Sequence, residues 1–180
     1  LSDTRGEAAG AAVTPSETGN RCMMVEIQTL MCRTAYGLPR RMSLGVDFNR
    51  LVVLIAVLEK RCGLVLGAQD VYLNAMGGIR LNEPSADLAV CAALASAEKM
   101  TPVEKYTAVF GEVGLTGEVR GVNCADKRVN ECLKMGFRRV VLPEKNMKAC
   151  EKFKGKIELV PVRYVSEMIK ALFPKEPGQA

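Results

Sequence analysis

The chain has 180 residues, of which 48% are hydrophobic and 25% charged, and it carries a formal net charge of +5 at pH 7. This composition indicates a compact domain with an apolar core and excludes a disordered or fibrous chain. No run of about 18 apolar residues occurs, so we expect no membrane-spanning helix. Because the chain begins with Leu1 rather than Met, we expect it to be a piece of a longer protein.

The spacing of apolar residues predicts strands that alternate with helices. It is clearest in the first strand, where Met23, Val25 and Ile27 alternate with polar residues. In chain order we expect a strand at 21–32, a loop at 33–46, a helix at 48–62, a strand at 69–78, a helix at 84–99, a strand at 107–114, a hairpin turn with a short strand at 115–122, a helix at 124–136, a strand at 137–143, a short helix at 146–155, a strand at 157–162 and a helix at 164–173. This alternation indicates an α/β (α+β) fold, with helices packed on a mixed sheet in two layers.

The composition changes at both ends of the chain. Residues 1–20 are small and polar, which is typical of a linker or of the end of a preceding domain. We therefore expect the folded domain to span residues 21–175 and residues 176–180 to form a polar tail. Inside the domain, Asp47 is a favoured N-cap for the first helix and Gly63 is a favoured residue for its end.

Cysteine and histidine usage limits the possible chemistry. The seven cysteines are widely spread and none forms a C-x-x-C pair, so we expect no zinc-finger or thioredoxin-like site. The same spread indicates a reducing compartment. The chain contains no histidine, which removes the most common general base and the most common metal ligand. Any catalysis would have to use lysine, a carboxylate or cysteine, and we expect no metal. The phosphate-binding GxxxxGK[ST] loop is also absent, so this chain is not expected to bind ATP.

One serine stands where a nucleophile could lie. Ser85, in the segment RLNEPSADLAV (80–90), follows a proline that favours the first turn of a helix. Backbone N–H groups at a helix start could stabilise negative charge there. The same position also suits a serine that only begins the helix, so both interpretations remain open.

Several long blocks between residues 21 and 173 occur in an order that a known family shares. They are VEIQTL, GLPRR, VDFNRLVVLIAVLEKRCGL, VYLNAMGGIRLNEPSADLA, VFGEVGLTGEVRGV and ADKRVNECLKMGFRRVVLPEKN. These blocks resemble the proteolytic domain of Lon proteases. They resemble more closely the Lon-like C-terminal domain of the RadA family of bacterial DNA-repair proteins. The resemblance implies the Lon-like fold, which is also that of ribosomal protein S5 domain 2.

The resemblance also places the residues of the Lon catalytic pair. Lon proteases carry their nucleophile in a G-P-S-A-G type block, which EPSAD occupies here, with Ser85 at the serine position. Arg128 falls at the position of the Lon lysine. Arginine stays protonated and cannot accept the serine proton. Lys127 is adjacent, but neighbouring helical positions point about 100° apart. We therefore expect no proteolysis, and an active Ser85–Lys127 peptidase is the alternative.

The RadA resemblance implies a role for the domain in a larger protein. RadA proteins are understood as ring-forming, DNA-dependent ATPases that drive branch migration in recombinational repair. It follows that this domain would support a hexameric ring and contact single-stranded DNA, with recombinase and replication proteins as possible partners and no membrane. ATP, magnesium and zinc would belong to domains outside this chain, which itself needs no cofactor. The bacterial cytoplasm is the expected compartment, and a purely structural oligomerisation domain is a further alternative.

Positive charge is concentrated in one segment. Residues 120–156 contain eleven Lys and Arg against four Asp and Glu, which is compatible with contacts to a phosphate backbone. The expected DNA-contacting residues are Lys127, Arg128, Arg138, Arg139, Arg40 and Arg41. For Arg128 we also consider an ion pair with Asp87 or Glu83 that fills the former active site.

Overall fold

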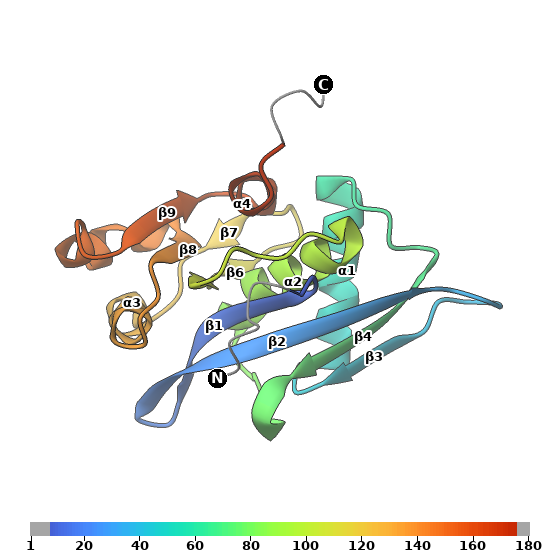
Figure 1. The fold of residues 1–180 in the computed structure, drawn as a ribbon, viewed down its shortest axis with the longest axis horizontal. Coiled ribbons are helices and arrows are strands. Elements are labelled where there is room, and N and C mark those ends of the chain that lie inside the picture. Colours follow the sequence, from blue (N-terminus) through green and yellow to red (C-terminus); the bar gives the residue numbers. More distant parts are fainter. Residues whose placement is uncertain (1–7, 176–180) are drawn as a thin grey trace.

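The computed structural model describes residues 8–175. It contains a seven-stranded sheet in the order β3-β4-β2-β1-β5-β8-β9 and a separate β6-β7 hairpin (Figure 1). The strands are β1 (Ala11–Thr18), β2 (Arg21–Arg33), β3 (Arg41–Leu44), β4 (Gln69–Ala75), β5 (Thr107–Val109), β6 (Glu112–Val113), β7 (Val119–Arg120), β8 (Arg139–Pro143) and β9 (Glu158–Val162). The α-helices are α1 (Phe48–Cys62), α2 (Asp87–Lys99), α3 (Ala125–Lys134) and α4 (Val165–Leu172). The 3-10 helices are η1 (Met76–Gly78), η2 (Pro84–Ala86), η3 (Glu144–Asn146) and η4 (Lys148–Phe153).

The sheet is mixed, which confirms the expected α/β class. Strands β1, β2 and β4 pair antiparallel, whereas β5, β8 and β9 pair parallel. The two halves meet where β1 runs parallel to β5. At the opposite edge β3 runs parallel to β4.

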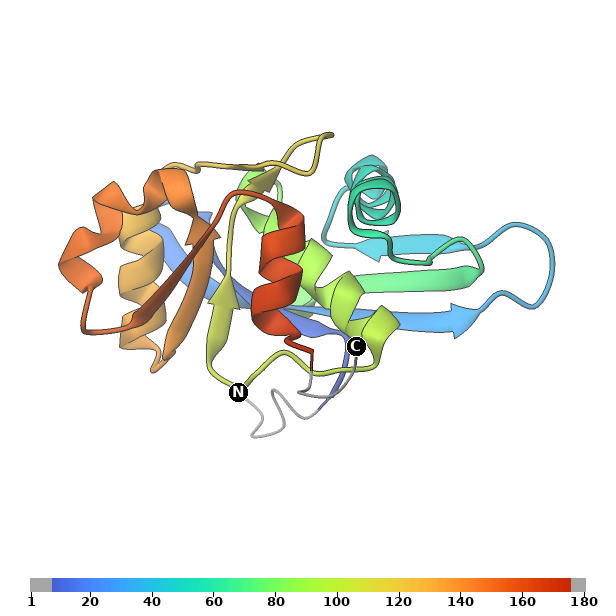
Figure 2. The ribbon, with the colours of Figure 1, turned by 90° about the horizontal axis from the view of Figure 1, so that it is seen from above.

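Helices cover both faces of one half of the sheet. Helices α1, α2 and α4 contribute to one apolar core, while α3 and η4 contribute to a second core with Ala108, Phe110 and Leu142. In β8, Val141 belongs to the first core and Val140 to the second, so this strand is buried on both sides. Helix α3 lies at the β8–β9 end of the molecule, far from α1 (Figure 2). In this half of the molecule the structure therefore has three layers, helix, sheet and helix, where two were expected.

The expectation of a linker over residues 1–20 is wrong for residues 11–18, which form β1 inside the sheet. Ala12, Val13, Thr14, Pro15 and Ser16 are all buried. Because β1 lies between packed layers, its residues are small, and small residues with a proline also characterise linkers. The folded unit therefore begins before residue 21, and residues 1–7 lie outside the described part.

Three other segments differ from expectation. The strand predicted at 69–78 ends at Ala75, and the 3-10 helix η1 follows it. The loop predicted at 33–46 contains the short edge strand β3, whose four residues give too short a pattern to recognise. The strand predicted at 107–114 divides into β5 and β6 around Phe110 and Gly111. Gly111 has a φ of 155°, and a Cβ there would lie 3.0 Å from a Val119 methyl group. This break lets the chain leave the sheet and pass beside Ser85.

The first helix confirms its predicted limits. The Asp47 side chain accepts a hydrogen bond from the Arg50 N–H at 2.9 Å, and Gly63 ends the helix with a φ of 70°. Leu51, Leu54 and Leu58 are fully buried along one face. Within residues 8–175, no helix is long and apolar enough to cross a bilayer.

Candidate functional site

Ser85 lies in the short helix η2, directly before α2, and only 4% of the residue is exposed. The chain after β5 holds this turn in place. The Gly111 N–H donates to the Ser85 carbonyl at 2.8 Å, and the Leu88 N–H donates to the Gly111 carbonyl at 3.0 Å. Ser85 is thus a fixed, buried residue at the start of a buried helix.

Arg128 lies in α3 with its side chain fully buried, and it forms an ion pair with Glu83, two residues before Ser85. The two guanidinium nitrogens Nη2 and Nη1 lie 2.8 and 3.1 Å from the two carboxylate oxygens. The other donors bind the Pro15 carbonyl at 3.1 Å and the carbonyl and side-chain oxygens of Asn123 at 3.0 and 3.1 Å. All five N–H donors of the guanidinium are used. Of the two carboxylates considered as partners for Arg128, the structure shows Glu83.

Two further donors complete the surroundings of Glu83. The Ser16 hydroxyl and the Glu17 N–H donate to the same carboxylate oxygen at 3.0 and 2.8 Å. Burial raises the pKa of Glu83, but the hydrogen bonds from Arg128 and Glu17 outweigh it, so the pKa lies below its usual value. Glu83 is therefore a weak base that stays ionised at neutral pH.

A second ion pair follows Ser85. Arg50, in α1, donates through Nε to Asp87 Oδ1 at 2.9 Å, and its Nη2 contacts Oδ2. The Val113 N–H also donates to Asp87 Oδ2 at 3.0 Å, while Arg50 Nη2 donates to the Val113 carbonyl at 2.7 Å. Burial outweighs the hydrogen bonds from Arg50 and the Val113 N–H, so the pKa of Asp87 lies above its usual value. Ser85 is thus flanked along the chain by two carboxylates, each held by an arginine.

The remaining candidates for a base or nucleophile are poorly suited to the chemistry. Lys127 is exposed, whereas the next side chain on α3, Arg128, points into the protein. Burial raises the pKa of the Cys22 thiol to about 11 and raises that of Cys91 well above its usual value, so both stay protonated at neutral pH. Within residues 8–175, no group of three His, Cys, Asp or Glu residues is arranged to hold a metal ion.

The pH dependence of stability provides a test of the Glu83 interactions. Because the folded-state pKa of Glu83 is lowered, its contribution is present above the unfolded-state pKa of about 4.3 and is lost as the pH falls through the folded-state pKa. Urea unfolding between about pH 6 and pH 3 is expected to show a smaller loss of stability in Glu83→Gln than in wild type. Equal losses in the two proteins would contradict the assignment.

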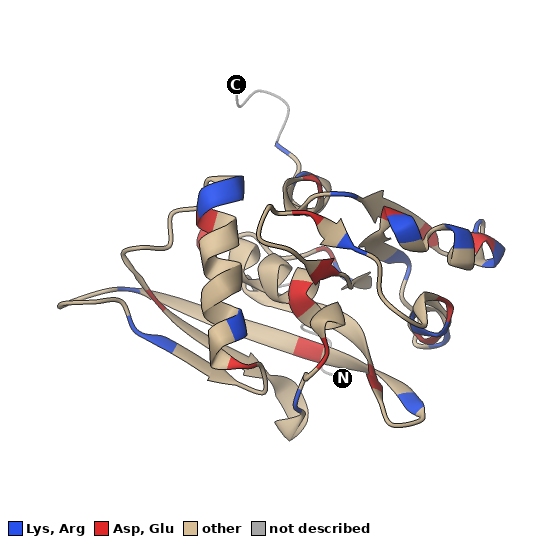
Figure 3. Cartoon of the chain, turned by 180° about the vertical axis from the view of Figure 1, so that it is seen from behind, with Lys and Arg blue, Asp and Glu red and all other residues tan. Residues whose placement is uncertain are grey.

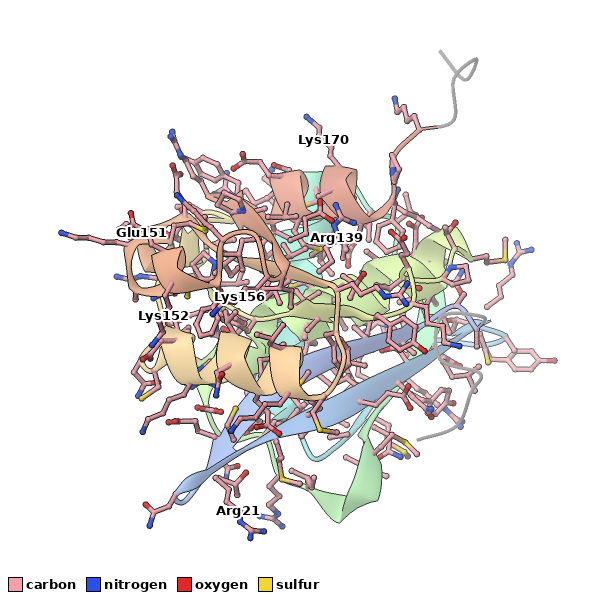
Figure 4. All side chains as sticks on the ribbon, turned by 60° about the vertical axis from the view of Figure 1, so that its left-hand side comes forward. Arg21, Arg139, Glu151, Lys152, Lys156 and Lys170 are labelled. Carbon is pink, nitrogen blue, oxygen red and sulfur yellow. The ribbon has the colours of Figure 1, made fainter. Side chains whose placement is uncertain are left out.

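The six expected DNA-contacting residues do not form one surface. Arg128 is buried, so the expectation that it contacts DNA is wrong. Arg139 is half-buried beside α4 (Figure 4), donates to the Ala171 carbonyl at 3.2 Å and has carboxylates of Glu104 and Glu158 within 3.9 Å. Arg41 donates through Nη2 to the Leu66 carbonyl at 3.0 Å. Both side chains are thereby committed to structural contacts.

The other three expected residues are exposed but separated. Lys127 lies in the first turn of α3, and Arg138 follows the end of that helix, which is about 15 Å long. Arg138 packs over the ring of Tyr106 at 5.1 Å. Arg40 lies just before β3, at the opposite edge of the sheet. Around η4, basic and acidic residues alternate (Figure 3), and Lys152 there lies 3.8 Å from Asp126.

Among the groups of the site that sequence reasoning missed are Arg50, Asn123 and the Pro15 carbonyl. Arg50 carried a usable signal, because it stands next to the apolar run 51–58 of a helix with a buried face. Asn123 and Pro15 carried none, because their oxygens become partners of Arg128 only through long-range folding.

Comparison with known proteins shows which family the chain resembles. The Lon protease (S16) C-terminal proteolytic domain matches residues 66–175. The chain is 45% identical over 170 residues to the DNA repair protein RadA of Bacillus subtilis (strain 168), covering 94% of this chain and 37% of that protein. It is 48% identical over 147 residues to the DNA repair protein RadA of Halalkalibacterium halodurans, covering 82% and 32%. For the DNA repair protein RadA of Streptococcus pyogenes serotype M3 (strain ATCC BAA-595 / MGAS315), identity is 44% over 166 residues, covering 92% and 36%.

The match includes most of the elements that build the site, whereas β1 and α1, which supply Pro15 and Arg50, precede residue 66. Helices α2 and α3 and the β6-β7 hairpin all lie within residues 66–175. The chain spans about a third of the length of the RadA proteins it matches. The chain belongs to the Lon protease (S16) C-terminal proteolytic domain family and is similar to part of RadA DNA repair proteins.

Proposed function

We propose that this chain is a non-proteolytic, Lon-like domain of a RadA-type DNA repair protein, which helps to assemble a ring and contacts DNA. The observation that carries the first part of the proposal is the ion pair between Arg128 and Glu83, two residues before Ser85. A serine hydroxyl becomes a nucleophile only when a base takes its proton. At the position that Lon proteases give to lysine, this chain has a side chain that cannot act as a base.

The surroundings of Ser85 support the same conclusion. In the G-P-S-A-G block of Lon proteases, the two glycines correspond to Glu83 and Asp87 here. Each carboxylate is bound by an arginine that crosses from another helix. The lowered pKa of Glu83 makes it a weak base. Lys127 would have to exchange places with Arg128 to approach Ser85.

The role in DNA repair rests on the relatives, whose names describe them as DNA repair proteins. For the whole protein we propose a hexameric, ATP-dependent machine that drives branch migration in the bacterial cytoplasm. ATP, magnesium and zinc would bind to domains outside this chain, and recombinase and replication proteins are candidate partners. In this chain, the basic segment 120–156 would supply positive charge for single-stranded DNA.

DNA binding by the chain is expected to be weak and sensitive to salt. Phosphate contacts release counterions, so affinity for an oligonucleotide falls as salt rises. Fluorescence anisotropy with a labelled dT oligonucleotide is expected to show binding at about 50 mM salt that is largely lost at about 200 mM. Absence of binding at the lower salt, by a folded oligomer, would contradict the DNA contact and favour a purely structural oligomerisation domain.

A further inference from the structure

A pocket lies at the carboxyl ends of the parallel strands β8 and β9. It has a volume of about 510 Å³ and is lined by β7, η3 and the junction between β9 and α4. Strand β7 and the start of α4 lie side by side in Figure 1. In sheets with parallel strands, ligands bind preferentially outside these carboxyl ends. Three of the lining residues are basic (Arg120, Lys145 and Arg163), two are acidic (Glu118 and Glu144), and Tyr164 is aromatic.

Hydrogen bonds between the Asn146 side chain and the Val122 backbone bring the segments of Arg120 and Lys145 together. Asn146 accepts a hydrogen bond from the Val122 N–H and donates one to the Val122 carbonyl, both at 2.9 Å. This double contact fixes η3 against the chain that follows β7. A Cβ placed on Gly121 would lie 3.4 Å from the Lys145 Cβ, so the lysine stem crosses directly beside the residue after Arg120.

A similar pair of contacts fixes the opposite wall. The Val119 N–H donates to the Arg163 carbonyl at 2.7 Å, and the Val165 N–H donates to the Gly117 carbonyl at 2.9 Å. The Tyr164 N–H donates to Glu167 at 3.0 Å. The β6-β7 hairpin and the start of α4 therefore hold Tyr164 at the pocket in a defined position.

The charges around the pocket are not balanced. Arg163 forms an ion pair with Glu144, and hydrogen bonding from Arg163 lowers the pKa of that carboxyl. Within the described part of the chain, the side chains of Arg120 and Lys145 have no hydrogen bond or ion pair. Tyr164 is 52% exposed, which leaves part of its ring available for contact. The one other charged lining residue is Glu118, whose Oε2 accepts a hydrogen bond from the Thr116 hydroxyl at 2.9 Å. The lining thus carries a net charge of +1, with two unpaired cations and a partly exposed aromatic ring.

We propose that this pocket binds a nucleotide unit, with its phosphate at Arg120 and Lys145 and its base stacked on Tyr164. Cations hold a phosphate without reading sequence, and any base can stack on an aromatic ring. The nucleotide can come from a DNA single strand or be a free mononucleotide. For the strand, the inference rests on the DNA contact proposed above and gives that contact a location.

The test compares two variants that remove equal charge from different surfaces. Arg120→Ala/Lys145→Ala is expected to weaken dT oligonucleotide binding about tenfold and to lower the slope of log affinity against log salt by about 1.4. The control, Lys127→Ala/Arg138→Ala, is expected to change the affinity and the salt slope less than Arg120→Ala/Lys145→Ala does. Tyr164→Ala is expected to weaken binding about fivefold or more, whereas Tyr164→Phe keeps the ring and the affinity. Calorimetry with dTMP on the same proteins tests the free nucleotide.

The outcomes separate the two proposals. Loss of oligonucleotide or dTMP binding in Arg120→Ala/Lys145→Ala but not in the control supports the pocket. If the control variant lowers oligonucleotide binding at least as much as Arg120→Ala/Lys145→Ala does, the pocket is overturned and the proposal of a DNA contact remains. Binding of dTMP without binding of the strand supports the pocket and contradicts the DNA contact. If wild type binds neither probe at about 50 mM salt, where phosphate contacts are strong, both are overturned.

Discussion

Arg128→Ala is expected to lower the free energy of unfolding by about 3–5 kcal/mol, because it breaks a buried pair and leaves one partner charged. Glu83 would keep only Ser16 and Glu17 as donors, and its side chain is only 24% exposed. The oxygens that Arg128 now binds in Pro15 and Asn123 would also lose their donor. Urea unfolding of wild type and variant measures the difference.

The neighbouring residue offers a matched control. Lys127→Ala changes an exposed side chain in the same turn of α3, and it is expected to change the free energy of unfolding by no more than about 0.5 kcal/mol. A loss below about 1 kcal/mol in Arg128→Ala would be typical of a solvated surface arginine. That result would contradict the buried pair.

Asp87→Asn is expected to cost about 2–4 kcal/mol, because it removes the charge that Arg50 binds while keeping the size of the side chain. Asp87 is buried at the start of α2 and accepts hydrogen bonds from Arg50 and from the Val113 N–H. The Arg50 side chain is 34% exposed, so water can partly replace the lost carboxylate. This exposure keeps the expected cost below that of Arg128→Ala.

Glu112→Gln makes the same chemical change next to Val113 and serves as the control for Asp87→Asn. Glu112 is half-buried and its negative charge raises the pKa of Asp87. Its replacement is therefore expected to change the free energy of unfolding by no more than about 0.5 kcal/mol. Equal effects of the two substitutions on the urea midpoint would show that Asp87 has no special role.

Most of the fold could be predicted because its elements have clear periodicity or clear end signals. Strand β2 alternates apolar and polar residues, and α1 lies between Asp47 and Gly63. Strand β1 could not be predicted, because a strand buried on both faces by neighbouring layers shows no alternation. The third layer was missed for a different reason. Nothing in the sequence of α3 indicates which face of the sheet the helix covers.

The candidate site was only partly predictable. Ser85 was found from its place at the start of a helix, and Arg128 through family resemblance, after which the chemistry of arginine argued against a base. The choice between Glu83 and Asp87 as partner of Arg128 depends on the relative placement of α1, α2 and α3, which local patterns do not encode. Arg50 binds Asp87 from a helix 37 positions earlier in the chain. Of the six basic residues expected at DNA, burial removed Arg128, and carbonyl contacts engaged Arg41 and Arg139.

Labelling with a fluorophosphonate probe tests whether Ser85 has a base. Mass spectrometry would measure labelling in wild type, Ser85→Ala and Arg128→Lys. We expect no Ser85 labelling in wild type. We also expect none in Arg128→Lys, because Glu83 would hold the new lysine as a cation. Labelling of wild type that is lost in Ser85→Ala would show that Ser85 is a nucleophile with a working base, and would overturn the non-proteolytic assignment.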